Sequence, residues 1–576
     1  MKKNKIFIGL NLYHPDTSLV ALNEEKILLA IEEERLNRIK HFSGFPKLSL
    51  DLLKKKFIKK NDELFFYLNT NPRSSFFRKS IHLIKNFNFE KVKDIKRNLN
   101  KINTKNKLEE IFDRNVHLKF VDHHLCHVLP SMYSSKYNES LMISVDAFGD
   151  FKSCEVYYLC KDEIKLIDSV YFPNSLGVFY SALTQFCGFN DYGDEYKLMG
   201  LSAHGKHEVK YEKLNDLISF SNKKLFTLNL KYFSHVKNSI EYEWNNKQPK
   251  VGTLFNKNEL EDLLKIKSNN KKNYTNYSGI AFMTQLIYEN TLFSLLKKYQ
   301  HISKNLILSG GCALNCLANG KIKEKTKFEN IHINFAPGDN GGALGAALYG
   351  HSKYFSSRKT KKIYNINSPY LGTKYSNEEI SSIIKIFDKK IKWKKLSKKE
   401  LIKFISLNLS KNKIIAYFRG KMEFGPRALG TRSILASPIK ERNKDLLNLK
   451  IKKRESFRPF APIVHANKQN NYFTNSWSSP FMSFVFKSRA NVKIPSALNI
   501  DKSGRVQSLN KKSNKDTYEI IQKFGNLTSV YALINTSFNK HEPIIENPSN
   551  AIKTFLETDI DYLILENYVI EKNKLL

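Results

Sequence analysis

The sequence predicts two α/β domains, residues 1–355 and 376–576, joined by a polar linker at residues 356–375. Strand-like apolar runs alternate with helical runs in both parts of the chain, which is the pattern of α/β domains. A chain of 576 residues also exceeds the usual size of a single domain. The linker is marked by the run SSRKTKK, and a new alternation of helices and strands begins after it.

The first domain is expected to begin with the strand KIFIGLNL, a turn at residues 14–16 and a hairpin within SLVALNEEKILLAIEEE. A buried strand, SLMISVDAFGD, precedes a strand meander, and residues 277–299 have the apolar spacing of a long buried helix. The domain ends with two strand–turn–helix units, NLILSGGCALNCLANGKI and NIHINFAPGDNGGALGAALYG. Polar insertions are expected at residues 80–110 and at about 207–275.

The composition excludes several classes of protein. Hydrophobic residues make up 41% of the chain, which is too many for a wholly disordered protein. No apolar run approaches the roughly 18 residues of a membrane span, and the N-terminal segment lacks the apolar core of a signal peptide. Six cysteines in this length form no disulfide framework. We therefore expect a cytoplasmic protein with no membrane partner.

The net charge of +40 does not by itself predict nucleic-acid binding. Only 15 of the 95 basic residues are Arg, and the lysines are spread along the chain among Asn and Ile residues. A dedicated nucleic-acid-binding arm would concentrate its basic residues on one face or in one segment. Nucleic acid is therefore not an expected partner, although non-specific, salt-sensitive affinity for polyanions stays open.

The segment VDHHLCHVLPSMY, residues 121–133, is the first candidate for a functional site. His123 and His127 are four residues apart, so on a helix they share one face, one turn apart. Two imidazoles at this spacing can bind one metal ion and leave positions open for catalysis once a carboxylate completes the set. Taken alone, such a pair is more often two packed histidines, and that alternative stays open. His124 and Cys126 are expected to be structural.

Eight of the 24 glycines lie between residues 310 and 350, in two strand–Gly turn–helix units. Such turns present backbone N–H groups and the positive end of a helix dipole, which suits a nucleotide phosphate chain. The pattern GxxxxGK[ST] does not occur in the sequence, so this is not a P-loop. Tight turns without a ligand would use glycine in the same way, and this alternative has equal weight. Asp339 lies within the second turn and is the candidate third ligand of the histidine metal site.

Arginine is concentrated in residues 419–458, which hold six of the 15 arginines. Five of these six lie in FRGKMEFGPRALGTRSIL and IKKRESFRPFAP, among glycines, prolines and aromatic residues. In a chain that otherwise uses Lys, this choice indicates planar, bidentate donors for phosphate or carboxylate groups. We prefer this interpretation to a solvated basic face. Arg505, Asn535 and Ser537 are weaker candidates for the same pocket.

Three smaller features complete the candidates. His14 lies at a turn beside Asp16 and can serve as a general base, although a loop histidine is more often incidental. Residues 35–41 contain a basic cluster, which is expected to be a solvated face. Asp146 and Asp150 bracket a glycine directly after a strand, which is typical of a turn that faces a phosphate or a metal ion.

Taken together, these segments resemble the O-carbamoyltransferases of nodulation-factor and antibiotic biosynthesis, the tobramycin and cephamycin carbamoyltransferase family. The resemblance rests on the residues and the order of motifs that cover almost the whole chain. Among them are EEERLNRIKHFSGFP, VDHHLCHVLPSMY, LSGGCALNCLANGK, PGDNGGALGAAL, GKMEFGPRALGTRSIL, IKKRESFRPFAP and INTSFNKHEPII. It implies an N-terminal domain with a duplicated actin/hexokinase-like fold, similar to the tRNA threonylcarbamoyltransferases. It also implies a C-terminal α/β domain similar to the enzymes that make threonylcarbamoyl-adenylate.

The resemblance implies a two-step activity as well. In such proteins the C-terminal domain forms carbamoyl-adenylate from carbamoyl phosphate and ATP, and the N-terminal domain transfers the carbamoyl group to a hydroxyl. The implied acceptor is a small molecule that contains a sugar, and the implied cofactor is a divalent metal ion, with iron as the first expectation. A homodimer is the assembly to test first.

The same resemblance assigns roles to individual residues. The metal ligands are His123, His127 and Asp339, with His14 as the base and Lys40 as a nearby positive group. Contacts to the nucleotide are implied for Asp146, Gly310, Gly311 and Asn315. The activation site for ATP and carbamoyl phosphate is implied at Arg427, Lys452, Arg458, Arg505, Asn535 and Ser537. Where the family often has Asp-Gly-x-Gly-Glu after the histidines, this chain has DAFGD at residues 146–150.

Two other functions stay open at this point. A carbamoylation enzyme that modifies tRNA is one, because both predicted domains have relatives there and the chain is basic. A non-catalytic polyanion-binding protein that uses the charge of +40 is the other. The concentration of arginine at residues 419–458 disfavours the latter, because a generic charged surface would use the abundant Lys of this chain.

Overall fold

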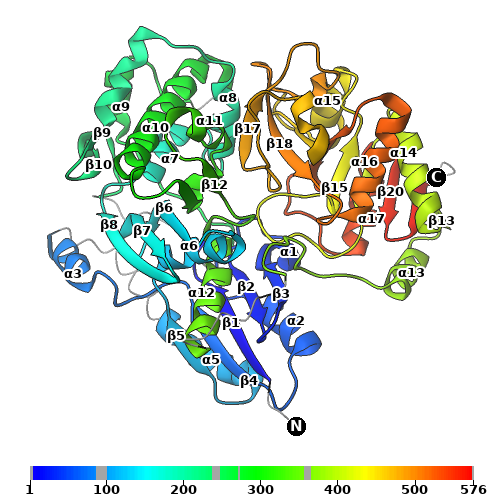
Figure 1. Ribbon diagram of the computed structural model, residues 1–576, viewed down its shortest axis with the longest axis horizontal. Coiled ribbons are helices and arrows are strands. Elements are labelled where there is room, and N and C mark those ends of the chain that lie inside the picture. Colours follow the sequence, from blue (N-terminus) through cyan, green and yellow to red (C-terminus); the bar gives the residue numbers. More distant parts are fainter. Residues whose placement is uncertain are drawn as a thin grey trace. The chain divides into compact units, whose positions relative to one another are not determined.

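The chain folds into two compact units, Met1–Asn367 and Ser368–Leu576, each of which is described by itself. The computed structural model describes residues 4–85, 100–236, 247–269, 273–355, 363 and 365–573 (Figure 1). Residues 356–362 and 364 of the predicted linker lie outside the described residues, as do 86–99, 237–246 and 270–272 of the predicted insertions. Within the described residues, no helix combines the length and apolarity that a bilayer crossing requires.

The first unit contains two five-stranded sheets with the same topology. The first has the order β3-β2-β1-β4-β5, with β1 antiparallel to β2, β2 antiparallel to β3, and β4 and β5 parallel to β1. Its strands are β1 (Lys5–Asn11), β2 (Ser18–Leu22), β3 (Ile27–Glu32), β4 (Glu63–Leu68) and β5 (His117–Phe120). The antiparallel pair β2 and β3 confirms the predicted hairpin.

The second sheet repeats this arrangement about 130 residues later in the chain. It has the order β12-β11-β6-β7-β8, in which β6 pairs antiparallel with β7 and parallel with β11. Its strands are β6 (Glu139–Gly149), β7 (Lys152–Cys160), β8 (Glu163–Tyr171), β11 (Asn305–Ser309) and β12 (Asn330–His332). Both sheets therefore place their strands in the chain order 3-2-1-4-5, which confirms the duplication that the family resemblance implied.

Helices cover these sheets, and two of them carry the residues of the candidate site. These are α6 (His123–Ser134) and α12 (Asp339–Tyr354), while α10 (Ser278–Tyr299) confirms the predicted long buried helix. The other helices are α1 (Glu33–Asn37), α2 (Lys47–Phe57), α3 (Phe76–Lys85), α5 (Thr104–Phe112), α7 (Leu176–Phe186), α8 (Glu195–Ser202), α9 (Lys257–Leu264) and α11 (Cys316–Lys325). A small hairpin of β9 (Ile218–Ser221) and β10 (Leu225–Leu228) lies within the second predicted insertion.

Glycines allow α12 to pack directly against its neighbours. A Cβ atom built on Gly345 would lie 1.8 Å from the carbonyl oxygen of Cys126 in α6. A Cβ on Gly9 of β1 would lie 1.8 Å from the carbonyl oxygen of Ala343 in α12. Backbone thus meets backbone on both sides of α12, which explains part of the glycine-rich sequence by packing rather than by ligand binding.

Gly345→Ala is expected to destabilise the protein. Alanine in a helix interior would gain about 1 kcal/mol over glycine if space allowed. Here the added methyl group overlaps a carbonyl oxygen, and overpacking costs about 1–3 kcal/mol or more. A lower Tm in thermal unfolding is the expected result. Gly338→Ala is the matched control, because its Cβ would meet nothing closer than 3.9 Å, and an equal Tm for both variants would contradict the packing argument.

The second unit is built on one mixed sheet of nine strands. Their order is β13-β21-β20-β14-β15-β19-β16-β18-β17. The strands are β13 (Ile391–Lys395), β14 (Ile415–Phe418), β15 (Arg432–Ala436), β16 (Ala461–His465), β17 (Phe484–Lys487), β18 (Ser503–Leu509), β19 (Ala532–Ser537), β20 (Tyr562–Leu565) and β21 (Tyr568–Lys572). The helices are α13 (Asn377–Ile386), α14 (Lys398–Ser410), α15 (Arg442–Leu446), α16 (Lys515–Thr528) and α17 (Pro548–Leu556). The predicted α/β class is therefore confirmed for this unit too, with Ile384, Phe555 and Leu563 among its core residues.

A single buried carboxylate organises the loop between β14 and β15 that contains the sequence GPRALG. Glu423 is 2% exposed, and its Oε1 accepts the backbone N–H groups of Leu429 at 2.8 Å, Thr431 at 2.7 Å and Arg432 at 3.2 Å. Three convergent N–H donors on one charged oxygen form a strong anchor. The loop that follows Arg427 is thereby held in one conformation.

The carbonyl groups of the same loop are held from other elements. Ala428 accepts from Asn535 of β19, and Leu429 accepts from Gln507 of β18. Arg432 is fully buried and lies over the Phe418 ring at 3.6 Å, with its guanidinium donating to the carbonyls of Thr431 and Gly420. The loop therefore has partners for its backbone on both sides.

Glu423→Ala is expected to cost more stability than Glu423→Gln. The alanine leaves three buried N–H groups without an acceptor, for a loss of about 3 kcal/mol or more, whereas the glutamine retains an oxygen that can accept them. Chemical denaturation measures the free energies of unfolding. Glu441→Ala, at an exposed position, serves as the control and should match the unaltered protein. Equal losses for the alanine and glutamine variants would contradict the anchoring role.

Candidate active site

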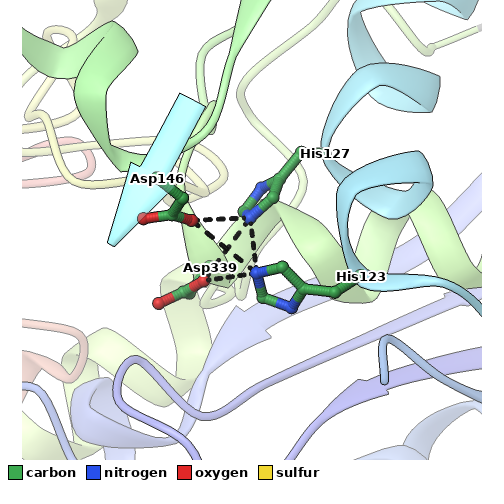
Figure 2. A group of neighbouring side chains, drawn as sticks. All are labelled: His123, His127, Asp146 and Asp339. Atoms are coloured by element: carbon green, nitrogen blue, oxygen red, sulfur yellow. Dashed lines mark hydrogen bonds and ion pairs between the residues drawn. The ribbon is translucent and has the colours of Figure 1, made fainter. Parts of the chain in front are cut away.

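Four side chains from three elements converge in the first unit (Figure 2). His123 and His127 extend from α6, Asp146 from β6 and Asp339 from the first turn of α12. Their potential ligand atoms all lie within 4.8 Å of one another. The structure thus brings together the three residues that the sequence predicted as metal ligands, and it adds Asp146 to them.

The donor atoms fit one metal ion. Ligand atoms about 2.1 Å from a common ion lie about 3.0–3.4 Å apart in tetrahedral or octahedral geometry. His123 Nε2 lies 2.9 Å from His127 Nε2, and both lie 3.5 Å from Asp339 Oδ1. Asp146 Oδ2 is 2.9 Å from His127 Nε2 and 3.7 Å from His123 Nε2. Two imidazoles and two carboxylates at these separations are a donor set that suits Zn²⁺ or Fe²⁺.

The arrangement of these polar atoms also favours a shared cation. Asp146 Oδ2 and Asp339 Oδ1 are buried and make no hydrogen bond of regular geometry to the described residues, although the imidazoles are close. Burial alone would lower the pKa of His127, but attraction from Asp146 and Asp339 outweighs it and raises the pKa to about 10. The same contacts hold the pKa of Asp146 well below its usual range in spite of burial. Two buried carboxylates therefore require positive charge at this point.

Backbone and side-chain contacts fix the orientation of His123. The N–H of His123 donates to Asp150 Oδ2 at 2.9 Å, and Asp150 Oδ1 accepts from Thr70 Oγ1 at 2.8 Å. His123 Nδ1 lies 3.2 Å from the Asn69 carbonyl oxygen, which suits an Nδ1–H donor and leaves the Nε2 lone pair directed at the site. A Cβ on Gly149 would lie 1.9 Å from the His123 ring, so only glycine fits there.

The neighbouring histidine has the structural role that the sequence predicted. His124 is fully buried, and its Nδ1 lies 2.8 Å from Ser144 Oγ. Burial and the nearby charges of His123 and His127 lower its pKa to about 3, so it is neutral. Cys126 is likewise buried, as expected.

The turn at residues 14–16 places His14 at the site. His14 Nδ1 lies 3.2 Å from Asp339 Oδ2, on the oxygen that is not directed at the other histidines. Asp16, two residues on, pairs with His41 Nδ1 at 2.7 Å. Burial lowers the pKa of His41, but attraction from Asp16 outweighs it and raises the pKa. This ion pair joins the turn that contains His14 to the segment that contains Lys40.

The basic cluster at residues 35–41 is not a solvated face, and that prediction was wrong. Arg35 is 4% exposed and pairs with Glu34 at 2.6 Å and with Glu32 at 3.4 Å. Glu32 and Glu34 of the same segment neutralise the Arg35 guanidinium, so it can be buried. Lys40, the predicted positive group of the site, has its Nζ 5.9 Å from the centre of the Tyr196 ring.

The predicted nucleotide contacts lie at the end of β11, next to Asp146. A Cβ on Gly310 would lie 2.1 Å from the Val145 carbonyl oxygen, and Gly310 has a φ of +87°. A Cβ on Gly311 would meet Asp146 Oδ1 at 2.8 Å. Both glycines are therefore needed for this close approach of two chain segments. Asn315 caps α11 and exchanges two hydrogen bonds of 3.0 Å with Gln285, so its side chain has protein partners.

Most of the predicted activation residues are neighbours in the second unit. Lys452 is buried, and its Nζ donates to the carbonyl and hydroxyl oxygens of Ser537 and to Asn539. Asn535 donates to the Ala428 carbonyl, directly after Arg427, and to Gln507 on β18.

The two remaining arginines lie on adjacent segments. Arg505 is on β18, two residues before Gln507. Arg458 pairs with Glu455 at 3.5 Å. Burial lowers the pKa of His541, and the nearby charges of Arg458 and Lys452 add to this effect, which places these two cations in one neighbourhood.

Half of the arginine cluster has a structural role instead. Arg419 donates to Asp516 at 2.8 Å and to Asn567, and the buried Arg432 supports the loop at residues 425–432. Arg454 donates to Asn448 at 2.7 Å and lies over the Phe460 ring. The concentration of arginine is therefore a weaker sign of phosphate binding than the sequence analysis assumed, because planar donors also suit buried carbonyl and amide oxygens.

Sequence reasoning left the roles of two residues of the first unit undetermined. Asp146 was placed in a turn that faces a phosphate or a metal ion, and the family resemblance assigned it to the nucleotide. The structure places its carboxylate among the candidate metal ligands. Asp150 was noted only as part of a turn, whereas it anchors the first residue of α6. The strand, the glycine and the two bracketing carboxylates were the available signal, but the sequence did not show that β6 ends beside α6.

Two family models match the chain. The model described as "Carbamoyltransferase N-terminus" matches residues 6–348, and "Carbamoyltransferase C-terminus" matches residues 406–572. Together they span most of both units, and they confirm the resemblance that the motifs indicated.

Individual relatives are similar over nearly the whole chain. The uncharacterized protein MJ1051 of Methanocaldococcus jannaschii is 32% identical, over 96% of this chain and 97% of that one. Nodulation protein NolNO of Sinorhizobium fredii is 28% identical, over 98% of this chain and 80% of its own. The solved structure of a ROK hexokinase from Thermus thermophilus covers 60% of this chain and 97% of that one, with 11% identity and a TM-score of 0.28. From the two family models and these full-length relatives, we conclude that the chain belongs to the carbamoyltransferase family.

Proposed function

We propose that this carbamoyltransferase uses ATP and carbamoyl phosphate to carbamoylate a hydroxyl group of a small, sugar-containing molecule. In the proposed sequence, carbamoyl phosphate and water give carbamate and phosphate, and carbamate attacks ATP to give carbamoyl-adenylate and pyrophosphate. The acceptor hydroxyl then displaces AMP and becomes a carbamate ester. The observation that carries the proposal is the convergence of His123, His127, Asp146 and Asp339, with His14 beside them.

The first unit is the proposed place of carbamoyl transfer. His123, His127 and Asp339 would hold a divalent metal ion, with iron as the first candidate and Asp146 as a further ligand. Such an ion would act as a Lewis acid that polarises the carbamoyl carbonyl group. His14 is oriented by Asp339 and is the proposed base, because a neutral imidazole can accept the proton of an attacking hydroxyl. Lys40 supplies positive charge nearby, where AMP would leave.

The second unit is the proposed place of adenylation. Arg427, Arg458 and Arg505 offer planar donors to the phosphates of ATP and carbamoyl phosphate, and Lys452 adds a point charge. Asn535 and Ser537 orient these groups through the hydrogen bonds described above. The loop fixed by Glu423 supports Arg427, so that this guanidinium loses little freedom when a phosphate binds.

Removal of one ligand is expected to abolish metal binding. His127→Ala and Asp339→Asn should hold no stoichiometric metal after loading and gel filtration, as measured by plasma mass spectrometry. Asp146→Asn should bind the metal at least about tenfold more weakly. The control is His301→Ala, because this histidine is exposed and distant from the cluster in sequence. Full metal occupancy in His127→Ala would contradict the assignment.

Different variants are expected to lose the two proposed steps, adenylation and carbamoyl transfer. The unaltered protein is expected to release AMP and pyrophosphate from ATP only when carbamoyl phosphate is present. Arg427→Ala should lose pyrophosphate release, whereas His123→Ala should retain it and lose only the transfer to the acceptor. Chromatography of the nucleotides and mass spectrometry of the acceptor provide these measurements. ATP turnover that is indifferent to carbamoyl phosphate would refute the proposal, and a carbamoylated tRNA nucleoside as product would redirect it to the tRNA-modifying class.

A further inference from the structure

Helix α3 (Phe76–Lys85) of the first unit presents four apolar side chains to solvent. Phe76 is 70% exposed, Phe77 is 77% exposed and Ile84 is 80% exposed, and Ile81 is also exposed. At 100° per residue these four positions fall within one arc of about 140°, so they form one face of the helix. An isolated exposed apolar residue needs no explanation, whereas a helix face of two phenylalanines and two isoleucines does.

Two polar side chains of α3 contact aromatic rings of the protein. His82 lies 4.7 Å from the Phe172 ring and 5.7 Å from the Phe151 ring, centre to centre. The Arg78 guanidinium lies 4.0 Å from the centre of the Tyr171 ring, at the end of β8. Figure 1 shows α3 at the margin of the first unit, near β8. These four apolar side chains are thus exposed on one face, whereas an ordinary surface helix buries its apolar face.

The charge around this face selects the kind of partner. The sequence from Leu64 to Ile84 contains no Asp or Glu, and it contains Arg73, Arg78 and Lys79. A basic helix with phenylalanines on its apolar face is the pattern of a helix that lies in the plane of a bilayer interface. A second copy of the same helix would bring like charges together, which disfavours a dimer through this face. An anionic surface satisfies both the apolar face and the charge.

We propose that α3 is the docking surface of this protein for an anionic lipid bilayer. The helix lies flat, the rings of Phe76 and Phe77 and the side chain of Ile84 enter the acyl boundary, and basic residues contact lipid headgroups. The sequence predicted no membrane partner because no segment could span a bilayer, but a helix that lies on the surface does not need that length. The proposal does not depend on the carbamoyl-transfer mechanism.

The position of α3 links this surface to the candidate active site. Thr70 Oγ1 and the N–H of Asn71, which precede α3, both donate to Asp150. Asp150 also accepts the N–H of His123. The segment that leads into α3 is therefore joined, through Asp150, to the first candidate metal ligand.

Vesicle co-sedimentation with the full chain tests the proposal. The probes are vesicles of phosphatidylcholine alone and of phosphatidylcholine with phosphatidylglycerol, in low salt and in about 0.5 M salt, where general attraction of a +40 protein is screened. The triple variant F76S/F77S/I84S is expected to bind the anionic vesicles at least about tenfold more weakly than the unaltered protein in both salts. The double variant V209S/I386S removes apolar side chains that are 73% and 77% exposed elsewhere, and it should bind as the unaltered protein does.

Three results would overturn the proposal. The first is no binding of the unaltered protein to anionic vesicles. The second is equal binding by the triple variant, which would assign attachment to net charge alone. The third is that light scattering shows a dimer for the unaltered protein and a monomer for the triple variant, which would make this face an interface between copies. An unchanged Tm of the triple variant shows that it folds, and the assay contains neither ATP nor acceptor, so its outcome is separate from that of the proposed function.

Discussion

The close approach of α12 to α6 is the constraint on which the first unit depends. Gly345 allows the backbone of α12 to contact the carbonyl group of Cys126, one position before His127. Asp339, at the start of α12, is thereby brought within 3.5 Å of both imidazole Nε2 atoms of α6. Any side chain at this contact would push the two helices apart. A shift of about 1 Å in the ligand positions is enough to impair a metal site. Packing without side chains is thus the condition for convergence of the ligands.

The same convergence creates a need for positive charge beside the two carboxylates. Asp146 and Asp339 are both nearly buried, and a buried carboxylate is stable only when it is paired. Without another cation, the demand is met by a proton on His127, whose pKa rises to about 10. The cluster is therefore a place where the fold maintains a strong preference for positive charge, and the histidines supply the lone pairs that direct this preference toward a metal ion rather than toward a lysine.

Several features of this structure could be predicted from the sequence, and the failures have physical causes. The His123–His127 pair and Asp339 were identified because helix periodicity and carboxylate chemistry are local signals. For Asp146 the sequence indicated a turn that faces a phosphate or a metal ion but could not choose between the two, because the choice depends on where β6 ends relative to α6. The six clustered arginines were read as phosphate donors, yet Arg419, Arg432 and Arg454 bind protein oxygens instead. Guanidinium chemistry is the same in both roles, so only the three-dimensional surroundings distinguish them. The exposure of the apolar face of α3 could likewise not be predicted, since periodicity shows that a helix has two faces but not which one points inward.

The spread of the cluster along the chain has a consequence for biosynthesis. His127 and Asp339 are separated by more than 200 residues in the sequence. All five strands of the second sheet lie between them in the chain, and the five strands of the first sheet precede both. During synthesis, both imidazoles leave the ribosome long before helix α12, which carries Asp339. Such an incomplete donor set binds ions weakly, so premature capture of an incorrect metal by an unfinished chain is disfavoured. In the proposed metal site, tight coordination would become available only after both repeats have docked, which would make loading of the ion a late checkpoint on correct assembly.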